Sequence, residues 1–175
     1  MIFLPIVSKI IGILNDKASP GQIGAGFALG AMIGLIPGFT LLSLFILIIV
    51  FLLNVNMTAA FLAIPIFKLA GYIVDPLSDQ IGLTFLTRMP PLSPLWTALY
   101  NLPFIPFTRF NNTVVLGNFI LGIALFIPIA LAVRKFVLVY RLKWRDRIER
   151  TRVMQMYRAS KLYDLWQTIN RFRQG

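Results

Sequence analysis

The stretch VVLGNFILGIALFIPIALAV, residues 114–133, is followed directly by Arg134 and Lys135. Twenty residues of α-helix rise about 30 Å, which is the thickness of the hydrocarbon core of a bilayer. Asn118 is the only strongly polar side chain in the stretch, and Pro128 is expected to kink it. Basic residues at the end of an apolar span are typical of its cytoplasmic side. The stretch therefore predicts a transmembrane helix that ends in the cytoplasm.

The composition favours a membrane protein over a soluble enzyme. Of the 175 residues, 58% are hydrophobic and 13% are charged, and the charged share is about half of that in soluble proteins. The absence of cysteine excludes disulfides and thiolate chemistry, and the absence of histidine removes the commonest general base and metal ligand. We therefore expect an all-α integral membrane protein that is not an enzyme and holds no cofactor or metal.

A second long apolar run, residues 23–53, is too long for one upright span and is divided by Pro37-Gly38. We predict helices over 20–36 and 39–53, the first with Ser19 as its N-cap and Pro20 at its first position. Each helix is near or below the roughly 17 residues that a full crossing needs. Two short spans and a re-entrant hairpin both remain open.

The rest of the membrane domain, 19–133, is expected to hold one further helix and one irregular region. A helix over 57–74 follows the polar turn Asn54-Val55-Asn56. Residues 75–113 contain six prolines among aromatic side chains, which predicts an irregular periplasmic segment with short helical pieces and no continuous helix. Residues 1–18 are predicted to form an interfacial helix. About four short or kinked transmembrane or re-entrant helices result.

The net charge of +11 is concentrated in the basic arm, residues 134–175, where twelve Lys and Arg stand against three acidic residues. Because the arm continues an apolar span, membrane orientation is a simpler explanation than nucleic-acid binding. We expect a long cytoplasmic amphipathic helix that contacts anionic lipids. The basic residues nearest the span are Arg134, Lys135, Arg141, Lys143 and Arg145.

Two further expectations concern the ends of the chain. Lys9 and Lys17 favour a cytoplasmic N-terminus, so the number of crossings should be even. Near the C-terminus an apolar stripe at helical spacing is expected to dock on a protein or on the membrane. Its members are Leu162, Leu165, Trp166, Ile169 and Phe172.

Four glycines are spaced by four residues: Gly26, Gly30, Gly34 and Gly38. On a helix the first three form a groove without side chains, into which another backbone can pack closely. Helix packing within the subunit is the favoured interpretation. A pore lining and a docking groove for a partner are the alternatives.

Several polar side chains are candidates for an intramembrane polar site: Lys68, Tyr72, Asp75, Asp79 and Asn118. An unpaired lysine in an apolar helix costs roughly 3 kcal/mol on insertion scales. We therefore expect Lys68 to face the bundle interior and to be neutralised by Asp75, Asp79 or helix-end carbonyls. A structural pair or snorkelling and a site for an anionic head group or ion are both open.

The remaining polar residues have structural interpretations beside functional ones. Asp75 and Asp79, four residues apart, are suited to cation binding or acid/base chemistry, but helix termination around Pro76 is favoured. Asn118 is expected to hydrogen-bond a neighbouring helix.

Three motifs resemble the bacterial membrane family called domain of unknown function 2062. They are SPGQIGAGFALGAMIGLIPG at 19–38, Asn54-Val55-Asn56 and TVVLGN at 113–118. The resemblance extends over roughly residues 15–135. In particular, the chain resembles the family's short, stand-alone branch with a basic C-terminal extension. This resemblance implies a protein of the inner membrane of bacteria with outer membranes, whose gene often lies beside one for a larger envelope protein, and it implies no catalytic residues.

Two functions follow as expectations. The first is a non-enzymatic inner-membrane subunit of a cell-envelope complex, which anchors or serves a larger periplasm-spanning partner in lipid transport to the outer membrane. The second is a small oligomeric transporter or channel for an ion or an anionic solute or lipid, with Lys68 and Asp75 along its path. The expected partners are membrane lipids, the larger envelope protein and, for a transporter, further copies of the chain.

Overall fold

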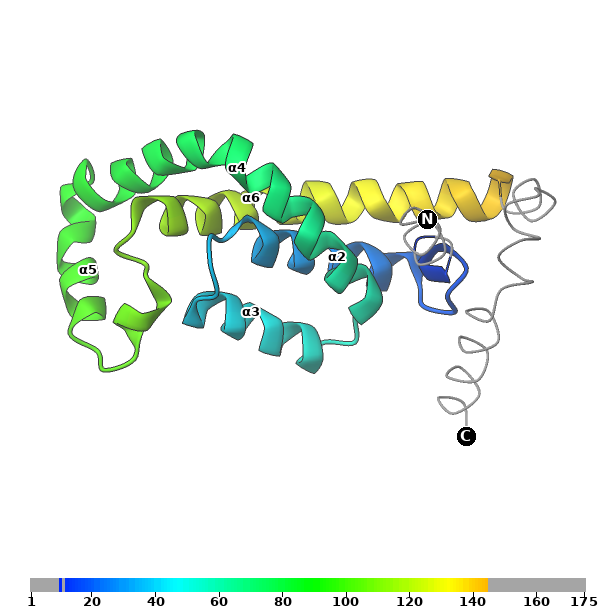
Figure 1. The fold of residues 1–175 in the computed structure, drawn as a ribbon, viewed down its shortest axis with the longest axis horizontal. Helices are drawn as coiled ribbons and strands as arrows, with labels where there is room; N and C mark the ends of the chain where they lie inside the picture. The colour runs from blue at the N-terminus through cyan, green and yellow to red at the C-terminus, as the bar shows by residue number, and fades with distance from the viewer. Residues whose placement is uncertain (1–9, 11, 145–175) are drawn as a thin grey trace. The chain divides into compact units, whose positions relative to one another are not determined.

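The computed structural model describes residue 10 and residues 12–144, which are helical without any strand (Figure 1), so the all-α prediction is confirmed. The α-helices are α2 Pro20–Leu35, α3 Leu41–Leu52, α4 Met57–Thr87, α5 Ser93–Tyr100 and α6 Thr113–Val139. Short 3₁₀ turns occupy Pro90–Leu92 and Ile105–Thr108, and a π-helical turn, Tyr140–Trp144, follows α6. The chain divides into two compact units, residues 17–135 and residues 1–16 with 136–175, which are described separately.

Helices α2 and α3 begin at reciprocal caps. The Ser19 side chain accepts from the Gln22 backbone N–H, and the Gln22 side chain accepts from the Ser19 N–H. Thr40 and Ser43 make the same pair of bonds, so α3 begins two residues after the predicted position. Between the two helices Gly38 has a φ of +73°, a conformation that favours glycine.

Helix α4 corrects the prediction of a helix over 57–74 and an irregular segment over 75–113. It runs without a break through Pro65 and Pro76 to Thr87. A proline inside a helix has no N–H to donate to the carbonyl four residues earlier, so Pro76 leaves out the bond to Tyr72, and Pro65 leaves out the bond to Phe61. Contacts beyond Pro76 hold the helix together: Ser78 is fully buried, and Gly82 packs on α6. The irregular region is therefore confined to residues 88–112, including α5.

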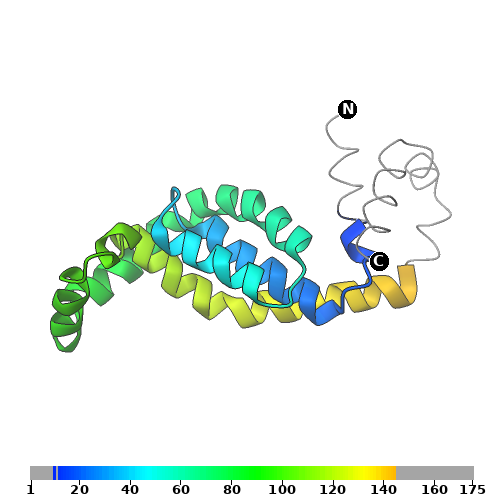
Figure 2. The same ribbon diagram turned by 90° about the horizontal axis from the view of Figure 1, so that it is seen from below.

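The order of the helix contacts defines the directions within residues 17–135. Gly26 and Gly30 of α2 lie against the carbonyls of Asn56 and Ala60, so α2 and α4 run parallel, and α3 connects the end of α2 to the start of α4. Helix α6 runs antiparallel to both. Thr113 and Gly117 lie against Gly82 and Ser78 of α4, and Gly122 and Ala130 lie against Met32 and Gly24 of α2. Figure 2 shows α6 extending alongside the α2, α3 and α4 group.

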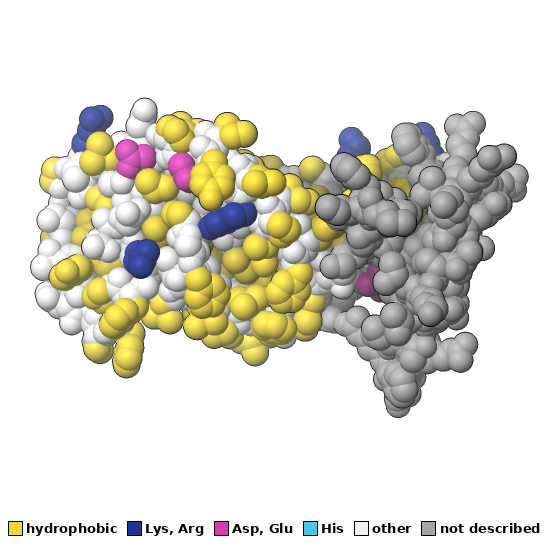
Figure 3. Space-filling view, in the orientation of Figure 1, with side chains coloured by type: hydrophobic (Ala, Val, Ile, Leu, Met, Phe, Trp, Pro, Cys, Tyr) yellow, Lys and Arg dark blue, Asp and Glu magenta, His cyan; other side chains and the backbone are white. Residues whose placement is uncertain are grey.

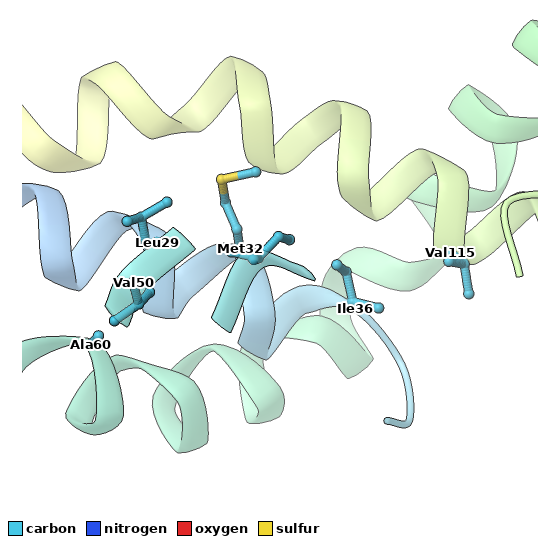
Figure 4. Close-up of a cluster of buried hydrophobic side chains, with 7 residues drawn as sticks. Leu29, Met32, Ile36, Val50, Ala60 and Val115 are labelled. Carbon is cyan, nitrogen blue, oxygen red and sulfur yellow. The ribbon is translucent and has the colours of Figure 1, made fainter. Parts of the chain in front are cut away.

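A small apolar core lies where α2, α3, α4 and α6 meet (Figure 4). Ile36 and Val50 are fully buried in it. Its members are Leu29, Met32, Ile36, Ile46, Val50, Ala60 and Val115.

The outward faces of the same helices are also apolar. Leu69 and Ile73 of α4 are 71% and 83% exposed, and Phe39 is 77% exposed. Two helices, Met57–Thr87 and the one beginning at Thr113, are long and apolar enough to cross a membrane, and only 22% and 28% of their most apolar windows are buried. Hydrophobic side chains are spread over the described part of the face in Figure 3. A core helix of a soluble protein would instead be mostly buried.

In the other unit, residues 14–16 are bound to the π-helical turn that follows α6. Arg141 donates from Nε to the carbonyl of Leu14 at 3.0 Å and from Nη2 to the carbonyl of Asp16 at 2.8 Å. Most of the predicted helix over 1–18, and the basic arm beyond residue 144 with its apolar stripe, lie outside the described residues.

Candidate functional site

The spaced glycines form the contact between α2 and α4. A Cβ at Gly26, Gly30 or Gly34 would overlap backbone carbonyls at Asn56, Ala60 and Ile64 of α4, which are themselves four residues apart. Two helix backbones therefore lie in direct contact over about two turns. The groove is filled by α4, as the helix-packing interpretation expects, and is closed to a partner at these glycines.

Gly38 does not belong to this contact, which corrects its inclusion in the groove. It follows the end of α2, and a Cβ built there would have no atom within 4 Å. The spacing of four continues in the sequence, but the helix ends at Leu35, so Gly38 is turned away from the row. Its positive φ is what requires glycine.

Buried polar side chains join α4 to α6. Ser78 Oγ donates to Asn118 Oδ1 at 2.7 Å, and Asn118 Nδ2 donates to Asp75 Oδ1 at 2.7 Å. One turn away, the Thr113 hydroxyl donates to Asp79. Asn118 and Ser78 are fully buried. Asp75 and Asp79 therefore lie inside α4 and bind it to α6. The prediction that they terminate or cap a helix is wrong.

Lys68 is neutralised by a helix end, one of the three partners considered from the sequence. Its Nζ donates to the carbonyl of Ile36 at 2.9 Å, at the C-terminal end of α2. The last carbonyls of a helix have no partner within it and carry partial negative charge, so a cation is favourable there. Lys68 is partly buried, and its ammonium closes the end of α2.

A cavity of about 80 Å³ lies beside this contact. It brings together Lys68, Tyr72 and Asp75 of the predicted polar site, whereas Asp79 and Asn118 are not in its lining. Its other lining residues belong to the end of α2, the turn after it and α4: Gly34, Leu35, Pro37, Gly38 and Gly71. The cavity therefore combines one cation, one carboxylate and one phenol.

The predicted lipid-contacting basic residues divide into three groups. Arg134, Lys135 and Lys143 are exposed. Arg141 is partly buried and bound to backbone carbonyls, so its guanidinium has a structural partner. Arg145 lies outside the described residues.

A second, larger cavity of about 430 Å³ was not foreseen from the sequence. It lies where α4, α5 and the start of α6 meet, and Trp96, Tyr100 and Phe110 are in its lining. Trp96 donates from Nε1 to the carbonyl of Phe85 at 3.0 Å and stacks on Phe110 with ring centroids 6.0 Å apart. The aromatic residues among the prolines were the available signal, but their meeting point depends on the extension of α4.

Further glycines bring α6 into close contact with α4 and with α2. Gly82 lies against the carbonyl of Thr113, Gly117 against that of Ser78, and Gly24 against that of Ala130 on α6. In the described residues no group of three or more His, Cys, Asp or Glu is placed to hold a metal ion.

Comparison with known proteins shows a similarity to an uncharacterized bacterial protein. No protein-family model and no solved structure matches the chain. The chain is 26% identical over 149 residues to an "Uncharacterized protein" of Treponema pallidum (strain Nichols), and the match covers 85% of this chain and 91% of that protein. The two proteins are thus similar over most of their lengths. The resemblance to domain of unknown function 2062 stays a prediction.

Proposed function

We propose that this chain is a multi-pass protein of a bacterial inner membrane with a cytoplasmic C-terminus. One observation carries the proposal: the apolar side chains of α4 and α6 face outward, while Ser78 and Asn118 are fully buried between the helices. Water would favour the reverse arrangement, whereas hydrocarbon favours this one. The exposed Arg134 and Lys135 at the end of the span support the orientation.

Within that membrane, we infer a non-enzymatic subunit that anchors or serves a larger envelope protein, in lipid transport to the outer membrane. Tight packing at Gly26, Gly30 and Gly34 favours a rigid support over a moving part. The polar groups between α4 and α6 bond one another, which suits packing better than a path for solutes. The resemblance to the 2062 family supports such a partner, because genes of that branch often lie beside one for a larger envelope protein.

The docking surface that we assign to this partner is the periplasmic end around α5 and the 430 Å³ cavity. Tyr100 is 54% exposed there, and aromatic side chains are enriched at protein interfaces. Prolines at the neighbouring turns keep the backbone rigid, which lowers the entropy lost on binding.

Affinity purification from native membranes in mild detergent tests the subunit role. We expect the tagged chain to retain one large envelope protein, and Tyr100→Ala to reduce its recovery about tenfold, as for an interface aromatic worth 1–2 kcal/mol. Ile127→Ala is the matched control, since Ile127 is 64% exposed on α6 and is assigned to lipid. Recovery of the chain without a stoichiometric partner would contradict the role.

The transporter alternative is favoured by one observation, the cavity that Lys68 and Asp75 share. It predicts a symmetric homo-oligomer that conducts an ion or anionic solute in proteoliposomes. Loss of that flux in Lys68→Met would then support transport, and a monomer without flux would exclude it.

A further inference from the structure

The 80 Å³ cavity lies level with the contact between Asp75 of α4 and Asn118 of α6. On α4 the apolar run 57–74 ends at Asp75, and on α6 the partner of Asp75 is Asn118, near the start of its span. Asn118 is sixteen residues before Arg134, or about 24 Å along the helix. If Arg134 marks one boundary of the hydrocarbon core, the cavity lies near the other, at the depth of lipid head groups.

Its two charged groups have hydrogen-bonding capacity left. Among the described residues, the Lys68 ammonium donates to Ile36, which leaves two of its three N–H groups available. Asp75 accepts from Asn118 through Oδ1, which leaves Oδ2 for another donor. A ligand with one anionic and one cationic hydrogen-bonding group would match both.

The surface around the cavity is apolar. Leu69, Tyr72 and Ile73 of α4 are each more than 70% exposed, and so is Phe39 beside the lining residue Gly38. A volume of 80 Å³ has room for the polar tip of a lipid but not for its chains. On the face in Figure 3, basic and acidic side chains lie close together amid hydrophobic ones. Acyl chains therefore have apolar surface beside the polar tip.

The geometry points to a binding site for a zwitterionic phospholipid that carries a primary amine, such as phosphatidylethanolamine. Lys68 donates to the phosphate, and Asp75 accepts from the ammonium. A choline head group has no N–H to donate, and a glycerol head group brings no cation to Asp75. This inference depends on the membrane location proposed above and is independent of the envelope partner.

Native mass spectrometry of the full chain in detergent, with equal amounts of phosphatidylethanolamine, phosphatidylcholine and phosphatidylglycerol of identical acyl chains, tests the site. We expect phosphatidylethanolamine to be retained roughly tenfold over the other two, as for one or two hydrogen bonds to charged groups. Asp75→Asn should abolish this preference and still accept the bond from Asn118. Lys68→Met should lower the retention of all three lipids, and Lys68→Arg should restore it.

Asp79→Asn is the matched control, because it removes a carboxylate that is not in the cavity lining and can still accept from Thr113. An unchanged preference in Asp75→Asn, or an equal loss in Asp79→Asn, would overturn the site. A thermal melt of each variant separates lost binding from lost folding. If the proposed membrane location is wrong, the chain should instead be monodisperse in buffer without detergent. If only the proposed envelope partner is wrong, the co-purification fails and the lipid preference remains.

Discussion

Asn118 is fully buried, and both ends of its amide are used: Oδ1 accepts from Ser78, and Nδ2 donates to Asp75. In an apolar environment each of these groups would otherwise be unsatisfied. A single amide thus joins α6 to two successive positions on one face of α4. Lys68 follows the same rule, because its ammonium is placed on the free carbonyl of Ile36.

Asn118→Leu should destabilise the protein by about 1–3 kcal/mol, because the Ser78 hydroxyl and Asp75 both lose a partner. For a chain of this size that corresponds to a Tm lower by roughly 2–4 °C per kcal/mol, measured by a thermal melt in detergent. Asn111→Leu makes the same chemical change at an exposed position and should leave Tm nearly unchanged. Equal melting of the two variants would mean that the buried bonds add little.

At the scale of the elements, glycine decides which helices meet. Gly26, Gly30 and Gly34 bring α2 onto α4, and Gly82 and Gly117 bring α4 onto α6. Lipid chains are as apolar as leucine, so close van der Waals contact is the main force available for this packing. The continuous α4 presents both contact rows on one element, which explains why a helix with two internal prolines persists.

Two glycine-to-alanine substitutions separate packing from helix propensity. Gly30→Ala would overlap the Ala60 carbonyl and should cost about 1–3 kcal/mol, as overpacking does. Gly71→Ala would meet its nearest atom at 3.5 Å, an ordinary contact, and should be neutral or up to about 1 kcal/mol stabilising. Denaturant or thermal unfolding of the two variants in detergent gives the comparison. Similar stability for both would refute the proposed role of the α2–α4 contact.

For the whole molecule, the lengths of the helices bear on how the chain sits in a membrane. Helix α3 has 12 residues, about 18 Å, and α2 has 16, about 24 Å. Both are shorter than a core of about 30 Å. Because Ile36 at the end of α2 lies in the same core cluster as Val115, the turn after α2 is level with the start of α6.

Single-cysteine labelling tests this arrangement. The chain has no cysteine of its own, so only the introduced residue can react. In spheroplasts, an impermeant maleimide should label Leu102→Cys fully and Phe39→Cys more slowly, since we place residue 39 at head-group depth. Lys135→Cys should react only after the membrane is permeabilised. Labelling of Lys135→Cys from outside would reverse the proposed orientation, and labelling of Phe39→Cys only from inside would exclude the proposed depth.

Within the membrane domain, the limits of helices were readable where local chemistry sets them. Ser19-Pro20 marked the start of α2, and Asn56 caps α4 next to the expected polar turn. The end of α4 was not readable, because local signals around Pro76 favour a break and the stabilising contacts come from residues 31–40 positions later. Gly38 was misassigned for a related reason: spacing continues through a turn although the helix does not.

The sequence by itself determined the helical class, the apolar character of the long helices and which side chains are costly to leave unpaired. These properties follow from composition and from patterns within a few turns of chain. Only the tertiary structure decided how those side chains are paired: Lys68 with the end of α2, Asn118 with Asp75 and Ser78, and Asp79 with Thr113. Such pairings depend on helix register, which is set by backbone contacts at glycines distant in sequence, and local patterns carry no information on that register.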